Sequence, residues 1–154
     1  GQRSTFTAGL NVNYQKFDNN QNYFTFGHGG YFSPQEFIAL GFPLRYSFKD
    51  EKLDLNASIT PGFQSYSQDQ VGLYPTDAAA QSVLDGLKAE NDDVRSYYDS
   101  MSKTGFAVSA DASLYYKVSP TMQIGGMANY NTFGNYNEFR SLLGVKKNFG
   151  SGDK

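Results

Sequence analysis

The stretch FAVSADASLYYKV, residues 106–118, decides the fold class of this chain. Apolar and polar side chains alternate along it, and a period of two places successive side chains on opposite faces of a β-strand. One face holds Phe106, Val108, Ala110, Ala112, Leu114, Tyr116 and Val118, and the other holds Ser109, Asp111, Ser113, Tyr115 and Lys117. Strands in soluble domains usually run for about five or six residues. The stretch therefore predicts one long amphipathic strand.

The same alternation recurs on both sides of this stretch. Strands are predicted near residues 4–17, 36–49, 53–67, 105–118, 122–133 and 138–149. Their polar faces carry mostly amides and hydroxyls, as a wall facing water would. Pro43 falls inside the second strand and predicts a bulge, bend or edge there, because proline cannot donate to the ladder. The sequence predicts an all-β fold, an antiparallel up-and-down meander of about six long strands over residues 1–149, with a disordered tail at 150–154.

Residues 76–101 interrupt this pattern with a helical one. Thr76 or Asp77 is expected to cap a helix that begins at residues 78–80, an alanine run. Two apolar stripes follow, one of Val83, Leu84 and Leu87 and one of Val94, Tyr97, Tyr98 and Met101. We expect a long connection with one or two helices, and a connection this long in a β domain is usually functional.

Composition narrows the class of protein further. The 154 residues are 39% hydrophobic and 16% aromatic, a combination typical of transmembrane β-barrels and also found in Tyr-rich β-sandwiches. The net charge of −2, with scattered Lys and Arg, argues against nucleic acid, and the absence of cysteine excludes disulfides. No stretch of about 18 apolar residues is present to form a membrane helix. No leader is visible at the first residues, so an exported protein would be a mature or excised piece.

The lengths of the connections favour a transmembrane β-barrel. Short turns at residues 49–52 and 119–121 alternate with long connections at 18–35 and 68–104, and with a moderate one near Gly134. Outer-membrane barrels have short turns at one end and long loops at the other. Six strands are too few to close such a barrel, because small ones need about eight. The chain is then part of a larger barrel, or it oligomerises, or it does not lie in a membrane.

Residues 23–35, YFTFGHGGYFSPQ, hold the only histidine of the chain among five aromatic rings. This glycine–aromatic loop, followed by the strand motif GFPLRY at residues 41–46, resembles the C-terminal domain of bacterial cellulose synthase operon protein C. Tyr74-Pro75, the stretch 105–116, the turn at 118–121 and the closing strand to Phe149 are similar to the same domain, so the resemblance covers nearly the whole chain.

The resemblance implies a fold, a location and partners. It implies that the chain forms the last strands of a 16-stranded outer-membrane β-barrel, and that a glucan leaves the cell through this barrel. In the parent protein, periplasmic tetratricopeptide repeats would precede the barrel. The implied partners are cellulose or a related glucan, outer-membrane lipid, the rest of the barrel and the repeats. No cofactor is implied.

A β-1,4-glucan offers flat apolar sugar faces that stack on aromatic rings and hydroxyls that bind amide and hydroxyl side chains. The expected polysaccharide contacts in the loop are Tyr23, Phe26, His28, Tyr31, Phe32 and Gln35. The alternative is that the rings, such as those of Phe24, Phe26 and Phe32, plug the loop against the wall. His28 would then be a structural hydrogen-bonding group.

Polar side chains of the strands are expected to face the lumen: Arg45, Asp54, Asn56, Asp111, Tyr115, Lys117 and Asn129. For the charged ones, ion pairs that brace neighbouring strands are the simpler explanation. No catalytic residue or metal ligand is predicted: a lone histidine is a poor zinc candidate, and Glu36 and Asp54 lie at opposite strand ends. The function expected is a passive conduit, not an enzyme. A soluble β-rich carbohydrate-binding module and a general porin are the alternatives.

Overall fold

A computed structural model describes Gly1 and residues 3–149 of the chain. The tail predicted at 150–154 lies outside the described residues. The described chain forms two compact units. Unit 1 consists of Gly1–Val12, Leu40–Phe63 and the chain from Phe106 onward, and unit 2 of Asn13–Ala39 and Gln64–Gly105. No helix among the described residues is long and apolar enough to cross a membrane.

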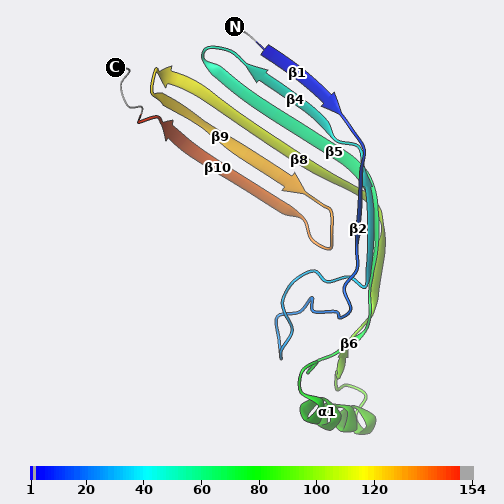
Figure 1. Ribbon diagram of the computed structural model, residues 1–154. Helices are drawn as coiled ribbons and strands as arrows, with labels where there is room; N and C mark the ends of the chain where they lie inside the picture. The colour runs from blue at the N-terminus through cyan, green and yellow to red at the C-terminus, as the bar shows by residue number, and fades with distance from the viewer. Residues whose placement is uncertain (2, 150–154) are drawn as a thin grey trace. The chain divides into compact units, whose positions relative to one another are not determined.

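Unit 1 is a single antiparallel sheet, and its strands follow one another along the chain (Figure 1). Its order is β1 (Arg3–Ala8), β4 (Leu44–Lys49), β5 (Leu53–Gln68), β8 (Met101–Ser119), β9 (Met122–Asn131) and β10 (Glu138–Lys147). β5 and β8 continue into unit 2. Within the described residues, β1 and β10 each pair on one side only. The antiparallel all-β meander is thus confirmed.

The register of these strands separates an apolar face from a polar face. Phe6 pairs with Tyr46, and Tyr46 with Ala57, across β1, β4 and β5. Across β8, β9 and β10, Leu114 pairs with Gly126, and Gly126 pairs with Leu143. These residues also form an apolar row. The alternate rows are polar, for example Asp111, Asn129 and Arg140. Because side chains alternate between faces, every other row of the sheet belongs to one face.

Two strands of the sheet are interrupted at the same level, one at Gly9 and the other at Pro43. β1 and β2 (Asn11–Gln15) are separated at Gly9, and β3 (Glu36–Gly41) and β4 at Pro43. The amide of Gly9 donates to the Pro43 carbonyl over 2.9 Å, and a Cβ on Gly9 would lie 3.4 Å from the proline ring. Proline has no N–H, so the ladder cannot continue through it. The irregularity predicted at Pro43 is present, and it extends to the neighbouring strand.

Tight turns in unit 1 depend on side-chain hydrogen bonds. The Asp50 carboxylate accepts from the backbone N–H groups of Leu53 at 2.6 Å and Lys52 at 2.7 Å. These two bonds stabilise the charged form and lower the pKa of Asp50 below its ordinary value. The stabilisation of the β4–β5 turn is therefore fully present above the ordinary aspartate pKa and is lost as the pH falls through the lowered pKa.

Unit 2 contains most of the buried side chains of the described residues. β2 and β3 are divided between the units, while β6 (Val71–Gly72), α1 (Ala78–Glu90) and β7 (Tyr97–Tyr98) lie wholly in unit 2. β6 and β7 form a separate two-stranded sheet. Most of the buried residues of the described chain are here: Asn20, Ser33, Pro34, Phe37, Ala39, Gln64, Tyr66, Gln68 and Ser96.

The start of the helix agrees with the sequence prediction, but the second apolar stripe lies outside the helix. Asp77 is the N-cap, and its side chain accepts from the backbone N–H of Ala80 at 2.9 Å. The helix ends at Glu90, and Asn91 caps it by donating to the Leu87 carbonyl. The second predicted stripe is not helical: Tyr97 and Tyr98 form β7, and Met101 begins β8 before the strand start expected at residue 105. Pairing with β6 overrides the helical spacing of this stripe.

We expect Asp77→Ala to loosen the first turn of α1. The substitution removes the carboxylate oxygen that accepts from the Ala80 N–H, a loss of about 1 kcal/mol that corresponds to roughly fivefold faster hydrogen exchange there. Asp77→Asn keeps a capping oxygen and should exchange at nearly the wild-type rate. Exchange of the Ala80 and Gln81 amides measures both, and equal rates in wild type and Asp77→Ala would contradict the cap.

Candidate functional site

A cluster of aromatic rings ties the glycine–aromatic loop (residues 23–35) to β6 and β7. The rings of Tyr23 and Tyr98 stack at 3.5 Å between centroids and 8° between planes. The His28 ring meets both of them edge-on, each at 5.4 Å. Thr25 Oγ1 and the Tyr98 hydroxyl share a 2.6 Å hydrogen bond. The loop is therefore held by a packed group of side chains rather than by its backbone alone.

The two ring nitrogens of His28 have different surroundings in this cluster. Nε2 lies 3.1 Å from the carbonyl oxygen of Gly72, so Nε2 carries the proton and donates to β6. Nδ1 is buried and has no hydrogen-bond partner among the described residues. Burial also raises the pKa of the neighbouring Tyr23 phenol, an effect that Arg95 partly offsets. The cluster thus holds His28 through one ring nitrogen and packs the Tyr23 phenol where burial disfavours its ionised form.

The loop backbone at Phe26 and Gly27 adopts the left-handed conformation. Phe26 has a φ of 51° and Gly27 a φ of 94°. A Cβ on Gly27 would lie 2.3 Å from Thr76 Oγ1, so a larger residue would displace that hydroxyl and would also be strained by the positive φ. The turn brings the Phe26 ring to 4.5 Å from the ring of Tyr74. The loop and the connection before α1 are in direct contact.

The end of the loop packs against the strands within unit 2. The Phe32 ring lies edge-on to Tyr66 at 5.0 Å and to Phe37 at 5.9 Å. Ser33 and Pro34 next to it are buried, and Ser33 Oγ accepts from the Gln21 amide at 2.6 Å. This packing favours the plugging role for Phe32. Phe24, by contrast, is 87% exposed.

A polar cavity of about 620 Å³ lies in unit 2, next to these rings. Of the residues predicted to contact a polysaccharide, only Gln35 lines it. The rings of Tyr23, Phe26, His28 and Phe32 lie in the surrounding clusters, and Tyr31 donates its hydroxyl to Gln21 at 3.1 Å. The other lining residues include Asp18, Asn19, Asn20, Gln21, Asp69, Gln70, Tyr74, Gln81 and Tyr97.

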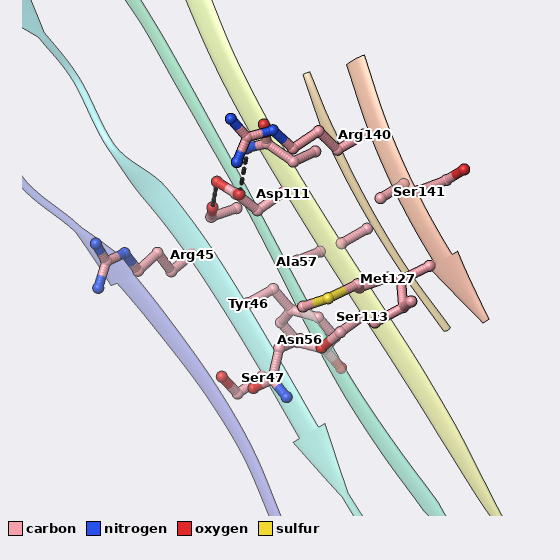
Figure 2. A pocket seen from close by; sticks show the side chains of 15 residues that line it. Arg45, Tyr46, Ser47, Asn56, Ala57, Asp111, Ser113, Met127, Arg140 and Ser141 are labelled. Atoms are coloured by element: carbon pink, nitrogen blue, oxygen red, sulfur yellow. Dashed lines mark hydrogen bonds between the residues drawn. The ribbon is translucent and has the colours of Figure 1, made fainter. Parts of the chain in front are cut away.

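A second hollow of about 780 Å³, the polar groove, lies on the polar face of unit 1 (Figure 2). Asp111 lines it and accepts from Asn129 Nδ2 at 2.6 Å and from Ser58 Oγ at 3.2 Å. Three of the predicted lumen-facing residues, Arg45, Asn56 and Asn129, line the groove with Asp111. Ser58 and Arg140 also line it and were not predicted.

The charged side chains of the polar face are only partly paired. Asp54 forms an ion pair with Lys49 at 3.4 Å, as the bracing explanation expects. Asp111 is held by an amide and a hydroxyl instead, and Arg45 and Lys117 form no ion pair with the described residues. The Tyr115 ring lies against Gly125, and Lys146 Nζ sits 3.4 Å from its centroid. Among the four charged residues predicted to face the lumen, only Asp54 therefore braces two strands through an ion pair within the described residues.

Sequence reasoning missed the role of Tyr98, whose ring contacts both Tyr23 and His28 in the loop cluster. Its spacing with Val94 and Met101 resembled a helix face. The available signal was the Tyr97-Tyr98 pair beside Arg95, whose guanidinium carbon lies 5.1 Å from the Tyr98 ring. Among Gly1 and residues 3–149, no three His, Asp or Glu side chains gather as a metal site would require.

Comparisons with known proteins agree on one family. A family model described as the cellulose synthase operon protein C C-terminus matches residues 1–150. The cellulose synthase operon protein C of Xanthomonas axonopodis pv. citri (strain 306) is 33% identical over 92% of this chain, and that of Pseudomonas fluorescens (strain SBW25) is 31% identical over 89%. The cellulose synthase 1 operon protein C of Komagataeibacter xylinus is 26% identical over 89%. The chain spans about a tenth of the length of these relatives, 10%, 10% and 11% respectively.

Proposed function

Because this chain belongs to the family of cellulose synthase operon protein C C-terminal domains, we propose that it forms part of an outer-membrane β-barrel through which a β-glucan such as cellulose leaves the cell. In this proposal the sheet of unit 1 is a section of the barrel wall. The rest of the barrel and the periplasmic repeats belong to the parent protein. The chain acts as a passive conduit and carries out no chemistry on the polymer.

The observation that carries the proposal is the uncovered apolar face of unit 1. Large apolar side chains there are open to the surroundings, with Leu143 at 89%, Phe139 at 69% and Phe6 at 67% exposure. A soluble β-sandwich would bury such a face under a second sheet. A barrel wall faces lipid on this side and water on the other. The single layer thus favours the membrane conduit over the soluble binding module.

The polar groove suits the passage of a sugar polymer. Its lining offers hydroxyl, amide and carboxylate groups to the hydroxyls of a glucan. Weak contacts spread along a wall let a polymer move without a deep binding minimum. In the same proposal, the glycine–aromatic loop guides the polymer on its way out through Phe26 and Tyr31, whose rings are about half exposed, and through Gln35. Tyr23, His28 and Phe32, also predicted as contacts, hold the loop in shape.

We expect Ser113→Trp in the full-length parent protein to reduce glucan export several-fold. The indole would project from β8 into the polar groove and narrow it. The matched control is Leu114→Trp, the next residue of β8, which lies on the apolar face. Secreted glucan is measured after cellulase digestion, and folded barrel is measured by heat-modifiable migration on a gel.

Normal export by a correctly assembled Ser113→Trp protein would overturn the conduit proposal. Single-channel conductance adds a second test: the same variant should conduct less, whereas Leu114→Trp should match the wild type. A general porin predicts that both variants export glucan equally, because the polymer would not use the channel.

A further inference from the structure

The polar cavity of unit 2 is built from groups that hold its own walls. Asn20 Nδ2 donates to the Asp69 carbonyl at 2.7 Å, and Gln35 Oε1 accepts from the Asp69 amide at 2.7 Å. Gln81 bridges the other side, accepting from the Tyr74 amide at 3.0 Å and donating to the Ser96 carbonyl at 3.0 Å. These bonds fix the cavity before any ligand arrives, which lowers the entropic cost of binding.

A second set of lining groups is left free. The side chains of Asp18, Asn19 and Gln70, and the carboxylate of Asp69, form no hydrogen bond with another described residue. Tyr74 also lines the cavity, and its ring packs against the Phe26 ring with 4.5 Å between centroids. The cavity therefore presents unused amides and carboxylates beside two tyrosines, Tyr74 and Tyr97.

This set of groups selects the chemical class of the ligand. Amides and carboxylates exchange hydrogen bonds with hydroxyl groups, and a tyrosine ring packs against the apolar face of a sugar. The lining holds two carboxylates, Asp18 and Asp69, and no lysine or arginine. Like charges repel, so an anionic ligand is disfavoured. At about 620 Å³ the cavity is within the usual size range of small-ligand sites.

We propose that this cavity is a saccharide-binding site that accepts neutral glucose units of the polymer and rejects anionic ones. The inference rests on the proposed export function and adds to it a defined subsite with charge selectivity. Asn19, Gln70 and Tyr74 bind the sugar. Asp18 and Asp69 supply the discrimination.

The test measures binding of two oligosaccharides to the full-length parent protein by calorimetry. The probes are cellohexaose and a carboxymethylated cellohexaose of the same length. Wild-type protein should bind the neutral probe at least about tenfold more tightly than the anionic one. Asn19→Leu with Gln70→Leu should weaken cellohexaose binding about tenfold or more, because two hydrogen bonds of about 1 kcal/mol each are lost. Val83→Ser, at an exposed helix position outside the cavity, should leave both affinities unchanged.

Asp18→Asn with Asp69→Asn separates charge selectivity from sugar binding. These replacements keep the size and polarity of the side chains and remove two negative charges. The affinity for cellohexaose should stay within about threefold of wild type, and the disadvantage of the anionic probe should largely vanish. Unchanged discrimination in this variant would overturn the selectivity, and unchanged cellohexaose affinity in the Asn19 and Gln70 variant would overturn the site.

The two proposals fail in different ways. If wild-type protein binds no cello-oligosaccharide but Ser113→Trp still blocks export, the cavity proposal alone is wrong. If Ser113→Trp exports normally while the cavity variants lose binding, the conduit proposal is wrong and the subsite stands as a property of a carbohydrate-binding module.

Discussion

Replacing Leu143 with arginine is expected to prevent the sheet of unit 1 from assembling in a membrane. Leu143 lies in the middle of β10, on the row with Gly126 and Leu114, and its side chain is 89% exposed. If this face meets lipid, a guanidinium at the midplane costs about 2–4 kcal/mol. That cost corresponds to roughly a 30- to 1,000-fold smaller ratio of folded to unfolded barrel.

The adjacent residue provides a matched control. Leu142 pairs with Met127 and lines the polar groove, so its side chain belongs to the opposite face. Leu142→Arg places the same charge one residue away, where the proposal expects water, and should assemble almost normally. Denaturant unfolding in lipid vesicles measures both variants. Equal loss in the two variants, or none in either, would contradict the assignment of the faces.

The sequence predicts the sheet because the apolar–polar alternation runs unbroken through long segments such as those of β5 and β8. Strand periodicity depends only on local geometry, so residues such as Asp111 and Asn129 could be assigned to one face before any partner was known. The breaks at Gly9 and Pro43 show the limit of local reasoning. Proline signals its own irregularity, but the matching break in the neighbouring strand follows from pairing across the sheet.

The loop cluster was less predictable for a related reason. The positive φ values near Gly27 agree with a glycine-rich stretch, and the structural role of His28 was an open alternative. Its partners Gly72 and Tyr98 lie 44 and 70 residues away in the chain, and no periodic pattern connects such positions. Likewise, the free groups of the cavity come from two separate connections. Long-range contacts of irregular segments leave no repeating trace in a single sequence.

Tyr98→Ala is expected to release the glycine–aromatic loop while leaving the sheet of unit 1 intact. The substitution removes the stack with Tyr23, the edge contact with His28 and the hydrogen bond to Thr25 together. A stacked pair contributes about 0.5–1.5 kcal/mol beyond its buried area, and a hydrogen bond about 1 kcal/mol. With the lost burial of a partly buried ring, we expect a local destabilisation of about 3 kcal/mol, or roughly 100-fold more frequent opening.

The amides of Gly30 and Tyr31 report this opening, because both donate to the Gln21 carbonyl inside the loop. Their hydrogen exchange should accelerate about 100-fold in Tyr98→Ala, but only about fivefold in Tyr98→Phe, which keeps the ring and loses one hydrogen bond. Amides of β10 should exchange at the wild-type rate in both variants. If Tyr98→Phe opened the loop as much as Tyr98→Ala, the hydrogen bond to Thr25 would hold the loop and the stacked rings would not. If neither variant changed exchange, Phe32 and the buried Ser33-Pro34 segment would anchor the loop without Tyr98.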